Sequence, residues 1–234
     1  MLKIILFDIM IFMKKILLKL LDLIYKKRCY FCGDSTRNLK MCEKCFHQIQ
    51  YLNQSPQKII DNCNVYSATL YKDNVQKMIR GLKYHNQYEL AFYQAKLMFD
   101  YWKNIEKSNY SYVIIPVPMF DKKEKKRGYN HMTLVAQEFA KLAGENYTVS
   151  TDIIKRIKDT KPQYKLTLKQ RQANLKNAFA LTEKYKNFKN KKFLIIDDIL
   201  TTGSTLHEMI KTLNTKSINN ITCLTTSCGE FYNN

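Results

Sequence analysis

Apolar and polar positions along the chain form blocks that predict an alternation of strands and helices. Residues 112–118 and 193–200 are nearly continuous apolar runs, the pattern of strands buried on both faces of a parallel sheet. Residues 65–71 alternate as a strand does, and residues 219–226 predict the last strand. This succession predicts an α/β fold with a mostly parallel sheet flanked by helices. Apolar residues recur at helical spacing in the segments 73–84, 87–103, 132–142 and 206–213.

Two acidic residues, Asp197 and Asp198, interrupt the apolar run at 193–200. Because the run stops at these carboxylates, we expect them at the carboxyl end of the strand, the edge where open α/β sheets bind ligands. At the loop that follows, free backbone N–H groups and the helix dipole favour the binding of a phosphate group. The carboxylates would repel that phosphate unless they face hydroxyls or a metal ion, and a ribose 5-phosphate offers this layout. The alternative is an ordinary strand–loop–helix unit with exposed acids. The loop consists of hydroxyl residues and one glycine: Thr201, Thr202, Gly203, Ser204 and Thr205.

The composition suits one α/β domain with a small appendage, because the chain has 234 residues of which 45% are hydrophobic. The formal net charge of +19 indicates a polyanionic partner, such as a nucleic acid or a nucleotide. The alternative is compositional bias, since the abundant lysine, asparagine, isoleucine and tyrosine all have A/T-rich codons. Arginine is scarce, so a retained arginine marks a position where the point charge of lysine cannot replace the planar guanidinium.

A basic segment, residues 121–130, joins the strand at 112–118 to the next helix. We expect a loop here. A basic loop at the carboxyl edge of the sheet can bind pyrophosphate, and Arg127 and Gly128 are its best candidates. The alternative is a charge run that contacts only water.

A second long basic segment, residues 153–180, is broken by Pro162. We expect a strand, an excursion, and a return at Ala178 and Phe179. Excursions of this length in compact domains are usually functional, and a lid that closes over bound phosphates fits this one. Its expected ligand-facing side chains are Arg156, Gln163, Arg171 and Asn174.

Four of the seven cysteines form two Cys-x-x-Cys pairs, Cys29 with Cys32 and Cys42 with Cys45. This spacing can close a tetrahedral site around Zn²⁺, and four protein ligands leave no open position, so the zinc would be structural. No segment resembles a cleavable secretory signal, which favours metal binding over disulfides. Two redox pairs are the alternative. We expect Cys223 in the core, within the last strand.

The first 25 residues are apolar but broken by charged residues, so they contain no uncharged run long enough to span a membrane. From Met13 onward the pattern is helical and amphipathic. We expect a helix that packs on the body of the protein, with a membrane-surface helix as the alternative, and either Met1 or Met13 as the start. The expected modules are an amphipathic helix at 1–28, a zinc module at 29–52, a linker at 53–64 and the α/β domain at 65–234.

Aromatic residues are concentrated in the helical segment 87–103. Most of them suit a hydrophobic core. The alternative is that they stack nucleobases, as aromatic side chains do in proteins that bind single strands. These residues are Tyr88, Phe92, Tyr93, Phe99 and Tyr101.

The order of motifs along the chain matches a known family. The motifs are the four cysteines, residues 79–84, Pro116-Val117-Pro118, Arg127-Gly128-Tyr129-Asn130, Arg156, Thr160, Pro162, Gln163, Arg171, Asn174, Ala178-Phe179 and residues 197–205. This order resembles the ComF family of bacterial competence proteins (ComFC-like). Within it, residues 193–205 resemble the signature of the type I phosphoribosyltransferases.

The resemblance implies a zinc-finger module on a type I phosphoribosyltransferase-like domain, in a cytoplasmic protein that supports natural transformation by uptake of single-stranded DNA. It implies that Asp197 and Asp198 contact the ribose hydroxyls. It also implies that residues 201–205 hold the 5-phosphate of phosphoribosyl pyrophosphate. Mg²⁺ would then bridge the hydroxyls and the pyrophosphate.

Other residues take roles from the same resemblance. Arg127 and the lid residues Arg156, Gln163 and Arg171 would neutralise the pyrophosphate. Many members of the family carry further cysteines after the first two pairs. Only Cys63 remains in that region here, so a second metal site is not expected.

Three functions compete. The first is a competence-associated protein that binds phosphoribosyl pyrophosphate and handles incoming single-stranded DNA, with turnover left open because no residue is an obvious base for a nucleophile. The second is a non-catalytic DNA-binding factor with phosphoribosyl pyrophosphate as a regulatory ligand. The third is a salvage-type phosphoribosyltransferase with an unknown acceptor, which the zinc pairs disfavour. The expected partners are phosphoribosyl pyrophosphate, single-stranded DNA and proteins of the DNA-uptake machinery, in the cytoplasm or at the inner face of the membrane without an integral span.

Overall fold

The computed structural model describes residues 13, 28–36, 39–108, 110–160, 167–188 and 191–229. The helix expected at residues 1–28 lies outside these ranges apart from Met13 and Arg28, and so do Pro162 and Gln163. The chain divides into two compact units, Met1–Ile49 and Gln50–Asn234. In the described ranges, no helix is both long and apolar enough to cross a membrane.

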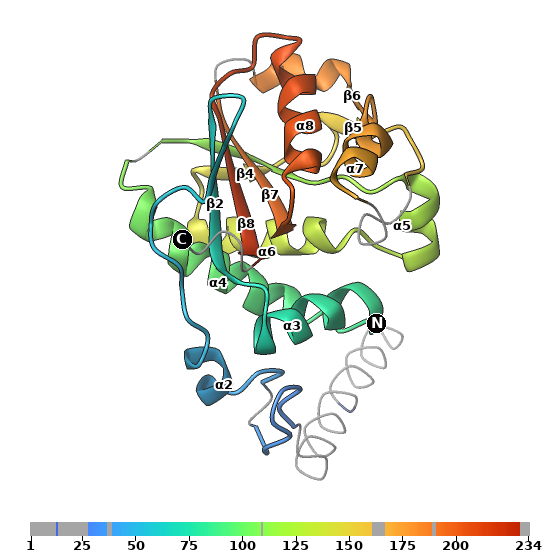
Figure 1. Ribbon diagram of the computed structural model, residues 1–234. Coiled ribbons are helices and arrows are strands. Elements are labelled where there is room, and N and C mark those ends of the chain that lie inside the picture. Colours follow the sequence, from blue (N-terminus) through green and yellow to red (C-terminus); the bar gives the residue numbers. More distant parts are fainter. Residues whose placement is uncertain are drawn as a thin grey trace, which may run out of the picture. The chain divides into compact units, whose positions relative to one another are not determined.

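In the described part of the larger unit, six strands form one sheet in the order β1-β2-β8-β7-β3-β4 (Figure 1). β1 pairs antiparallel with β2, and the other neighbouring strands of this sheet run parallel. The expected α/β fold with a mostly parallel sheet is therefore confirmed. The strands are β1 Lys58–Ile60, β2 Cys63–Leu70, β3 Tyr112–Pro116, β4 Tyr147–Val149, β7 Lys192–Leu200 and β8 Ile221–Cys228.

A separate antiparallel pair of strands, β5 (Ile154–Arg156) and β6 (Phe179–Leu181), lies between β4 and β7 in the sequence. The helix α7 (Leu168–Leu175) lies between these two strands, and the 3₁₀ helix η2 (Glu183–Phe188) leads on to β7. The strand, excursion and return that the sequence predicts for 153–180 are confirmed.

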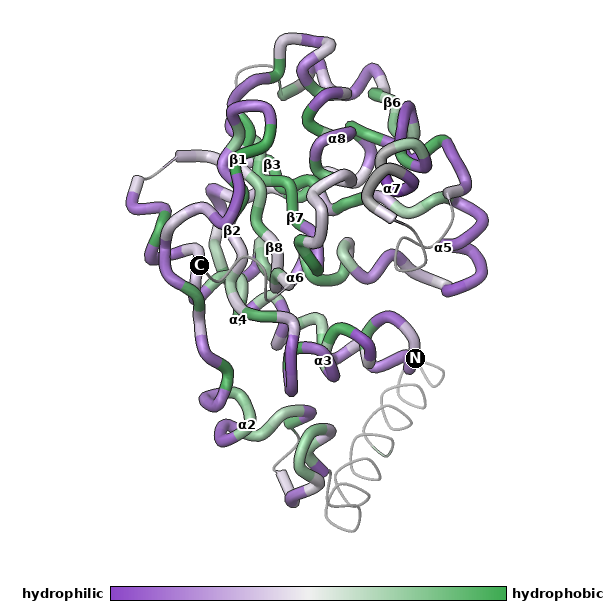
Figure 2. Tube along the Cα trace, in the orientation of Figure 1, coloured by the Kyte–Doolittle hydropathy of each residue, from purple (hydrophilic) through white to green (hydrophobic). Residues whose placement is uncertain are grey.

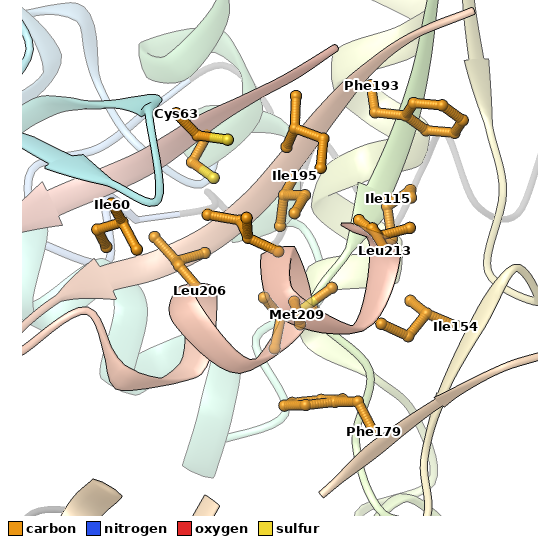
Figure 3. Packing of buried hydrophobic residues seen from close by; sticks show 14 of the residues in the cluster. Ile60, Cys63, Ile115, Ile154, Phe179, Phe193, Ile195, Leu206, Met209 and Leu213 are labelled. Carbon is orange, nitrogen blue, oxygen red and sulfur yellow. The ribbon is translucent and has the colours of Figure 1, made fainter. Parts of the chain in front are cut away.

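Helices cover both faces of the main sheet. On one face, Ile195 of β7 packs with Met209 of α8 in the hydrophobic cluster of Figure 3. On the other face, Gln94 of α4 donates a hydrogen bond to the Thr226 hydroxyl of β8 at 2.8 Å, and α6 packs against α4 and β3. The helices of this layer structure are α3 Asp73–Tyr84, α4 Leu90–Ile105, α5 Asp121–Arg127, α6 His131–Ala143 and α8 Ser204–Asn214.

Burial on both faces explains why the central strands are continuous apolar runs. Successive side chains of a strand point to opposite faces, so a strand covered on both sides needs apolar residues at consecutive positions. Figure 2 shows hydrophobic stretches along β3 and β7 and a hydrophilic α5. Cys223 lies in β8 with 0% of its surface exposed, as expected.

The expectation that β7 stops at the acidic pair is wrong. The strand continues to Leu200, because Ile199 and Leu200 pair with Ser227 and Cys228 of β8. The two carboxylates therefore lie within the strand, near its carboxyl end.

The expectation of a basic loop at 121–130 is also wrong, because Asp121–Arg127 form the helix α5. Acidic residues in its first turn and basic residues in its last turn complement the helix dipole. Gly128, with φ of 87°, ends the helix and donates its N–H to the Glu124 carbonyl oxygen at 2.7 Å.

The expected linker at 53–64 contains a strand, β1. Asp61 and Asn62 have φ of 48° and 64° in the two-residue turn that joins β1 to β2. Positive φ at both turn residues is the geometry that suits a tight hairpin, and asparagine and aspartate tolerate it well. The hairpin places β1 at the edge of the sheet.

Candidate functional site

Asp197 and Asp198 are neighbours in β7, so their side chains point to opposite faces of the sheet. Asp198 faces α3 and α6, where Lys83 Nζ and His131 Nε2 each lie 2.5 Å from its Oδ2 atom. Ser227 of β8 donates a hydrogen bond to the Asp198 carbonyl oxygen at 3.2 Å. Since Asp198 is only 6% exposed, it is a buried carboxylate held by two partners.

The two partners keep Asp198 ionised. Burial by itself would raise the pKa of this carboxyl, but the charge of Lys83 and the hydrogen bond from His131 hold the pKa well below its ordinary value. Burial opposes the charge on Lys83 as well, and Asp198 nevertheless raises the pKa of its ammonium. The arrangement is a buried ion pair with an added imidazole.

His131 links Asp198 to Arg127. Burial lowers the pKa of the imidazole below its ordinary value, so the ring is neutral near neutral pH. A neutral ring that donates from Nε2 to Asp198 accepts at Nδ1, and Nδ1 lies 3.1 Å from Arg127 Nη1. The guanidinium of Arg127 also lies over the ring of Tyr84, 5.6 Å from its centroid.

Asp197 has the opposite electrostatic setting. Burial and the neighbouring charge of Asp198 raise the pKa of the Asp197 carboxyl, against the positive charges of Lys83 and Arg156. Its Oδ1 accepts a hydrogen bond from the Asp198 N–H at 2.9 Å. Two adjacent carboxyls with pKa values pushed apart are typical of sites that bind or transform ligands.

The loop at 201–205 joins β7 to α8 with a glycine in the left-handed conformation. Gly203 has φ of 80°, and a Cβ atom at this position would lie 2.6 Å from a side-chain carbon of β1. The hydroxyls of Thr202 and Ser204 lie 2.8 Å apart, and Lys58 Nζ donates to the Thr202 carbonyl oxygen at 2.7 Å. The start of α8 therefore combines hydroxyls, a close backbone and an ammonium group, all of which suit a phosphate.

Arg156 brings the 153–180 excursion to the same edge of the sheet. Its guanidinium lies 5.6 Å from the centroid of the Phe179 ring and donates from Nη2 to the Thr160 hydroxyl. Its positive charge acts on Asp197. The Nε atom of Arg156 is buried and has no hydrogen-bond partner among the described residues. A buried guanidinium N–H without a partner is a donor suited to an anionic oxygen.

The structure thus brings together the acidic pair, the 201–205 loop, Arg156 and, through His131, Arg127. Gly128 serves as the end of α5. Arg171 and Asn174 lie half-buried on α7, within the excursion, and Gln163 lies outside the described residues.

Three further residues of the site, Lys58, Lys83 and His131, were not predicted from the sequence. Lys83 lies in the 79–84 motif, but no role followed from that motif, and lysine is so frequent in this chain that Lys58 does not stand out. A signal for His131 does exist in the neighbouring Asn130, whose side chain accepts a hydrogen bond from the Met132 N–H and so places His131 at the start of α6. The pairing of Lys83 and His131 with Asp198 depends on packing between helices far apart in the sequence.

The smaller unit contains the four-cysteine cluster. The sulfur atoms of Cys29, Cys32, Cys42 and Cys45 all lie within 4.8 Å of one another, and the Cys32 and Cys42 sulfurs are 3.7 Å apart. Sulfurs about 3.8 Å apart are what tetrahedral Zn–S bonds of about 2.3 Å require. The described residues fit a structural metal site.

Backbone hydrogen bonds support a thiolate at Cys29. The N–H groups of Phe31 and Cys42 each donate to its sulfur at 3.4 Å. Although burial raises the pKa of the Cys29 thiol, backbone hydrogen bonds from Cys32, Cys42 and Phe31 lower it to about 6. A deprotonated sulfur is the form that binds a metal.

Comparisons with known proteins agree with this geometry. The phosphoribosyl transferase domain family matches residues 125–227, a range that contains the acidic pair and the 201–205 loop. Competence protein F of Haemophilus influenzae is 28% identical over 192 residues, which cover 79% of this chain and 83% of that protein. The DNA utilization protein YhgH is 26% identical in Salmonella typhimurium and 24% identical in Escherichia coli K12, each over 193 residues, 79% of this chain and 83% of that protein.

The relatives and the domain match support a competence-associated role. The four-cysteine cluster adds the module that the ComF resemblance implies. The chain is therefore similar to competence protein F over most of its length, contains a stretch that matches the phosphoribosyl transferase domain family, and has a four-cysteine cluster at residues 29–45.

Proposed function

We propose that this protein binds phosphoribosyl pyrophosphate together with Mg²⁺ and handles incoming single-stranded DNA during natural transformation. One observation carries the first part. A carboxyl with a raised pKa, Asp197, precedes a loop in which a left-handed glycine begins a helix, and the charge of Arg156 acts on the same carboxyl. This is the combination that a ribose carrying a 5-phosphate and a pyrophosphate needs.

Each part of the ligand has a counterpart in the site. Asp197 would accept hydrogen bonds from the ribose hydroxyls, with Asp198 fixing the strand beside it. Residues 201–205 and Lys58 would hold the 5-phosphate. Arg156 and Arg127 would neutralise the pyrophosphate. Mg²⁺, which prefers carboxylate and phosphate oxygens, would add positive charge between the hydroxyls and the pyrophosphate.

The DNA-handling part rests on the relatives and on charge. Two of the relatives are named as a competence protein and a DNA utilization protein. The net charge of +19 suits a polyanion. This role requires the cytoplasmic side of the membrane, where single strands arrive, and it implies contact with proteins of the uptake machinery. The four-cysteine cluster would carry structural zinc.

The test of phosphoribosyl binding is calorimetric titration of the full, zinc-loaded chain with phosphoribosyl pyrophosphate and Mg²⁺. The Asp197→Asn variant should bind roughly 10- to 100-fold more weakly, because it loses hydrogen bonds made by a charged acceptor. Asp100→Asn is the matched control, since that carboxylate pairs with Lys96 and Lys103 on the surface of α4. A folded parent that shows no binding would refute the assignment and leave DNA handling as the main role.

Turnover of the ligand is a second candidate function. The raised pKa of Asp197 favours it, because a carboxyl that binds a proton near neutral pH can assist transfer to an acceptor. Phosphorus NMR would measure the release of pyrophosphate from phosphoribosyl pyrophosphate in the presence of purine or pyrimidine bases. Binding without release in every mixture would assign the site to binding alone.

A further inference from the structure

The segment that joins α3 to α4 exposes three aromatic rings. Tyr84 is 61% exposed, Tyr88 is 51% exposed and Phe92 is 39% exposed. These residues recur at a spacing of four along the chain, from the end of α3 into the first turn of α4. Together with Tyr129 we call them the aromatic surface.

Contacts from the end of α5 and from the residues that follow it hold two of these rings in place. Tyr88 packs edge-on against Tyr129, with ring centroids 4.7 Å apart. The hydroxyl of Tyr129 donates to the Leu82 carbonyl oxygen, and Arg127 lies over the ring of Tyr84. The rings are therefore positioned before any partner binds, which lowers the entropy cost of binding.

Cations border the aromatic surface. α5 carries the exposed Lys122, Lys125 and Lys126, and it ends in Arg127, which touches Tyr84. Arg80, one helical turn before Tyr84, is also exposed. The acidic residues of α5 are Asp121 and Glu124, and the exposed Glu89 lies beside Tyr88 in the sequence. Basic residues therefore outnumber acidic ones around the rings.

We propose that the aromatic surface is where single-stranded DNA binds, with bases stacked on the rings and phosphates bound by the cations of α5. The large exposed apolar side chains described on the 84–92 segment are all aromatic, and the basic residues beside them suit a polyanion whose bases stack on aromatic faces. A duplex hides the faces of its bases, so the surface selects single strands. The proposal rests on the DNA-handling part of the proposed function and assigns DNA binding to a defined surface of the molecule.

The position of Arg127 connects this surface to the phosphoribosyl site. Its guanidinium contacts both the ring of Tyr84 and the imidazole of His131, which bonds to Asp198. A strand bound on the rings therefore passes beside the site rather than through it. DNA and phosphoribosyl pyrophosphate are expected to bind at adjoining places.

The test is fluorescence anisotropy of a labelled oligothymidylate of about 20 nucleotides, titrated with the full, zinc-loaded chain. The Tyr84→Ala, Tyr88→Ala double variant should bind more weakly by roughly tenfold for each ring that stacks a base. The Tyr84→Phe, Tyr88→Phe variant keeps both rings and should bind as the parent does. Tyr110→Ala is the matched control, because Tyr110 is 52% exposed on the α4–β3 connection.

A second variant tests the cations. Lys125→Ala with Lys126→Ala should reduce the slope of log affinity against log salt concentration by about 0.7 for each phosphate that these lysines neutralise in the parent. An unlabelled duplex of the same length should compete poorly with the oligothymidylate.

The outcomes separate this proposal from the proposed function. If the parent and the double alanine variant bind the oligothymidylate with equal affinity, the aromatic surface is not the DNA-binding site, although the protein still binds DNA. The exposed rings would then be assigned to a protein partner. A parent that does not bind the oligothymidylate would overturn both the surface and DNA handling. Calorimetry with phosphoribosyl pyrophosphate reports the neighbouring site independently, and a Tyr88→Ala single variant, which leaves the contact between Arg127 and Tyr84 in place, should bind that ligand as the parent does.

Discussion

Lys83 and His131 reach Asp198 from two different helices and fix one carboxylate of the site before a ligand arrives. Its neighbour Asp197 has no such pair of side-chain donors among the described residues, and the pKa of its carboxyl is raised rather than lowered. Asp198 therefore stabilises the fold, whereas the charge on Asp197 would be stabilised by a ligand that donates hydrogen bonds to it. This difference between Asp197 and Asp198 gives two predictions about single residues.

Lys83→Met should destabilise the protein by about 3–5 kcal/mol, because it leaves the buried charge of Asp198 without its cation. Urea unfolding followed by circular dichroism measures this change. The Lys83→Met, Asp198→Asn double variant should recover much of the stability, since it removes both charges. Lys103→Met, which breaks a surface pair with Asp100, should change stability by only about 0.5 kcal/mol or less. Equal effects of the two lysine variants would contradict the buried pair.

The Asp197→Asn variant should be more stable than the parent at neutral pH. A carboxyl whose folded-state pKa lies above its unfolded value of about 3.9 binds more protons when folded, so stability falls as pH rises from about 4 through the raised pKa. Lys83, Arg156 and Asp198 are the charges that act on it.

Urea midpoints measured from acid to neutral pH check this sign. The gap between variant and parent should close as pH drops below about 4, where the carboxyl becomes protonated in both states. Asp100→Asn should show the opposite sign, because its partners Lys103 and Lys96 lower the pKa of Asp100 against the effect of burial. A variant that is less stable than the parent at neutral pH would show that Asp197 is not destabilised by burial.

At the scale of elements, the helix α8 and its loop depend on one backbone conformation. Gly203→Ala should destabilise the protein by about 1–2 kcal/mol through its left-handed φ, with an added cost from the approach to Ile60 Cδ1. Gly128→Ala is the matched control, since Gly128 also has a positive φ but nothing lies within 4 Å of its added Cβ. Urea unfolding of both variants separates the backbone cost from the steric cost.

Combining Gly203→Ala with Ile60→Val tests the approach of these two residues directly. Removing Cδ1 should make the glycine substitution less costly in the double variant than in the parent background. Strict additivity of the two substitutions would mean that only φ matters at this position.

Sequence patterns sufficed for the elements that periodicity defines and failed where charge or distant packing decides. The strands at 112–118 and 193–200 are long apolar runs, so their burial was predictable. α5 was not, because a string of charged residues has no apolar period, and only the order of its acidic and basic residues indicates a helix. The end of β7 was missed because backbone pairing with β8 continues past the carboxylates.

The same limit applies to the site. The acidic pair and the 201–205 loop were identifiable because they are contiguous in the sequence. Lys58, Lys83 and His131 come from three other elements, and their approach is set by the hairpin at Asp61 and by helix packing. The sequence carries a local signal for the position of His131, in Asn130, but none for its contact with Asp198.

At the scale of the whole molecule, the two units should respond differently to removal of metal. The described residues of the smaller unit include a cluster of four cysteines, whereas the larger unit has its own hydrophobic cluster. A chelator should therefore unfold the smaller unit while the larger unit keeps its structure and its affinity for phosphoribosyl pyrophosphate.

Thiol reactivity measures this outcome. After chelation, four thiols per chain should react quickly with Ellman's reagent, those of the cluster. Cys63, Cys223 and Cys228 should react slowly, because each is at most 4% exposed in the larger unit. Rapid reaction of all seven would show that the larger unit also depends on the metal.

The strand order has a consequence for how the protein is made. β8 is the last of the described strands to leave the ribosome, yet it lies between β2 and β7 in the middle of the sheet. Ser67 and Thr225, which are 158 positions apart in the sequence, share a hydrogen bond across β2 and β8. Until β8 is synthesised, β2 and β7 both present open edges, which exposes the nascent chain to misassembly and makes the centre of the sheet the last part to form.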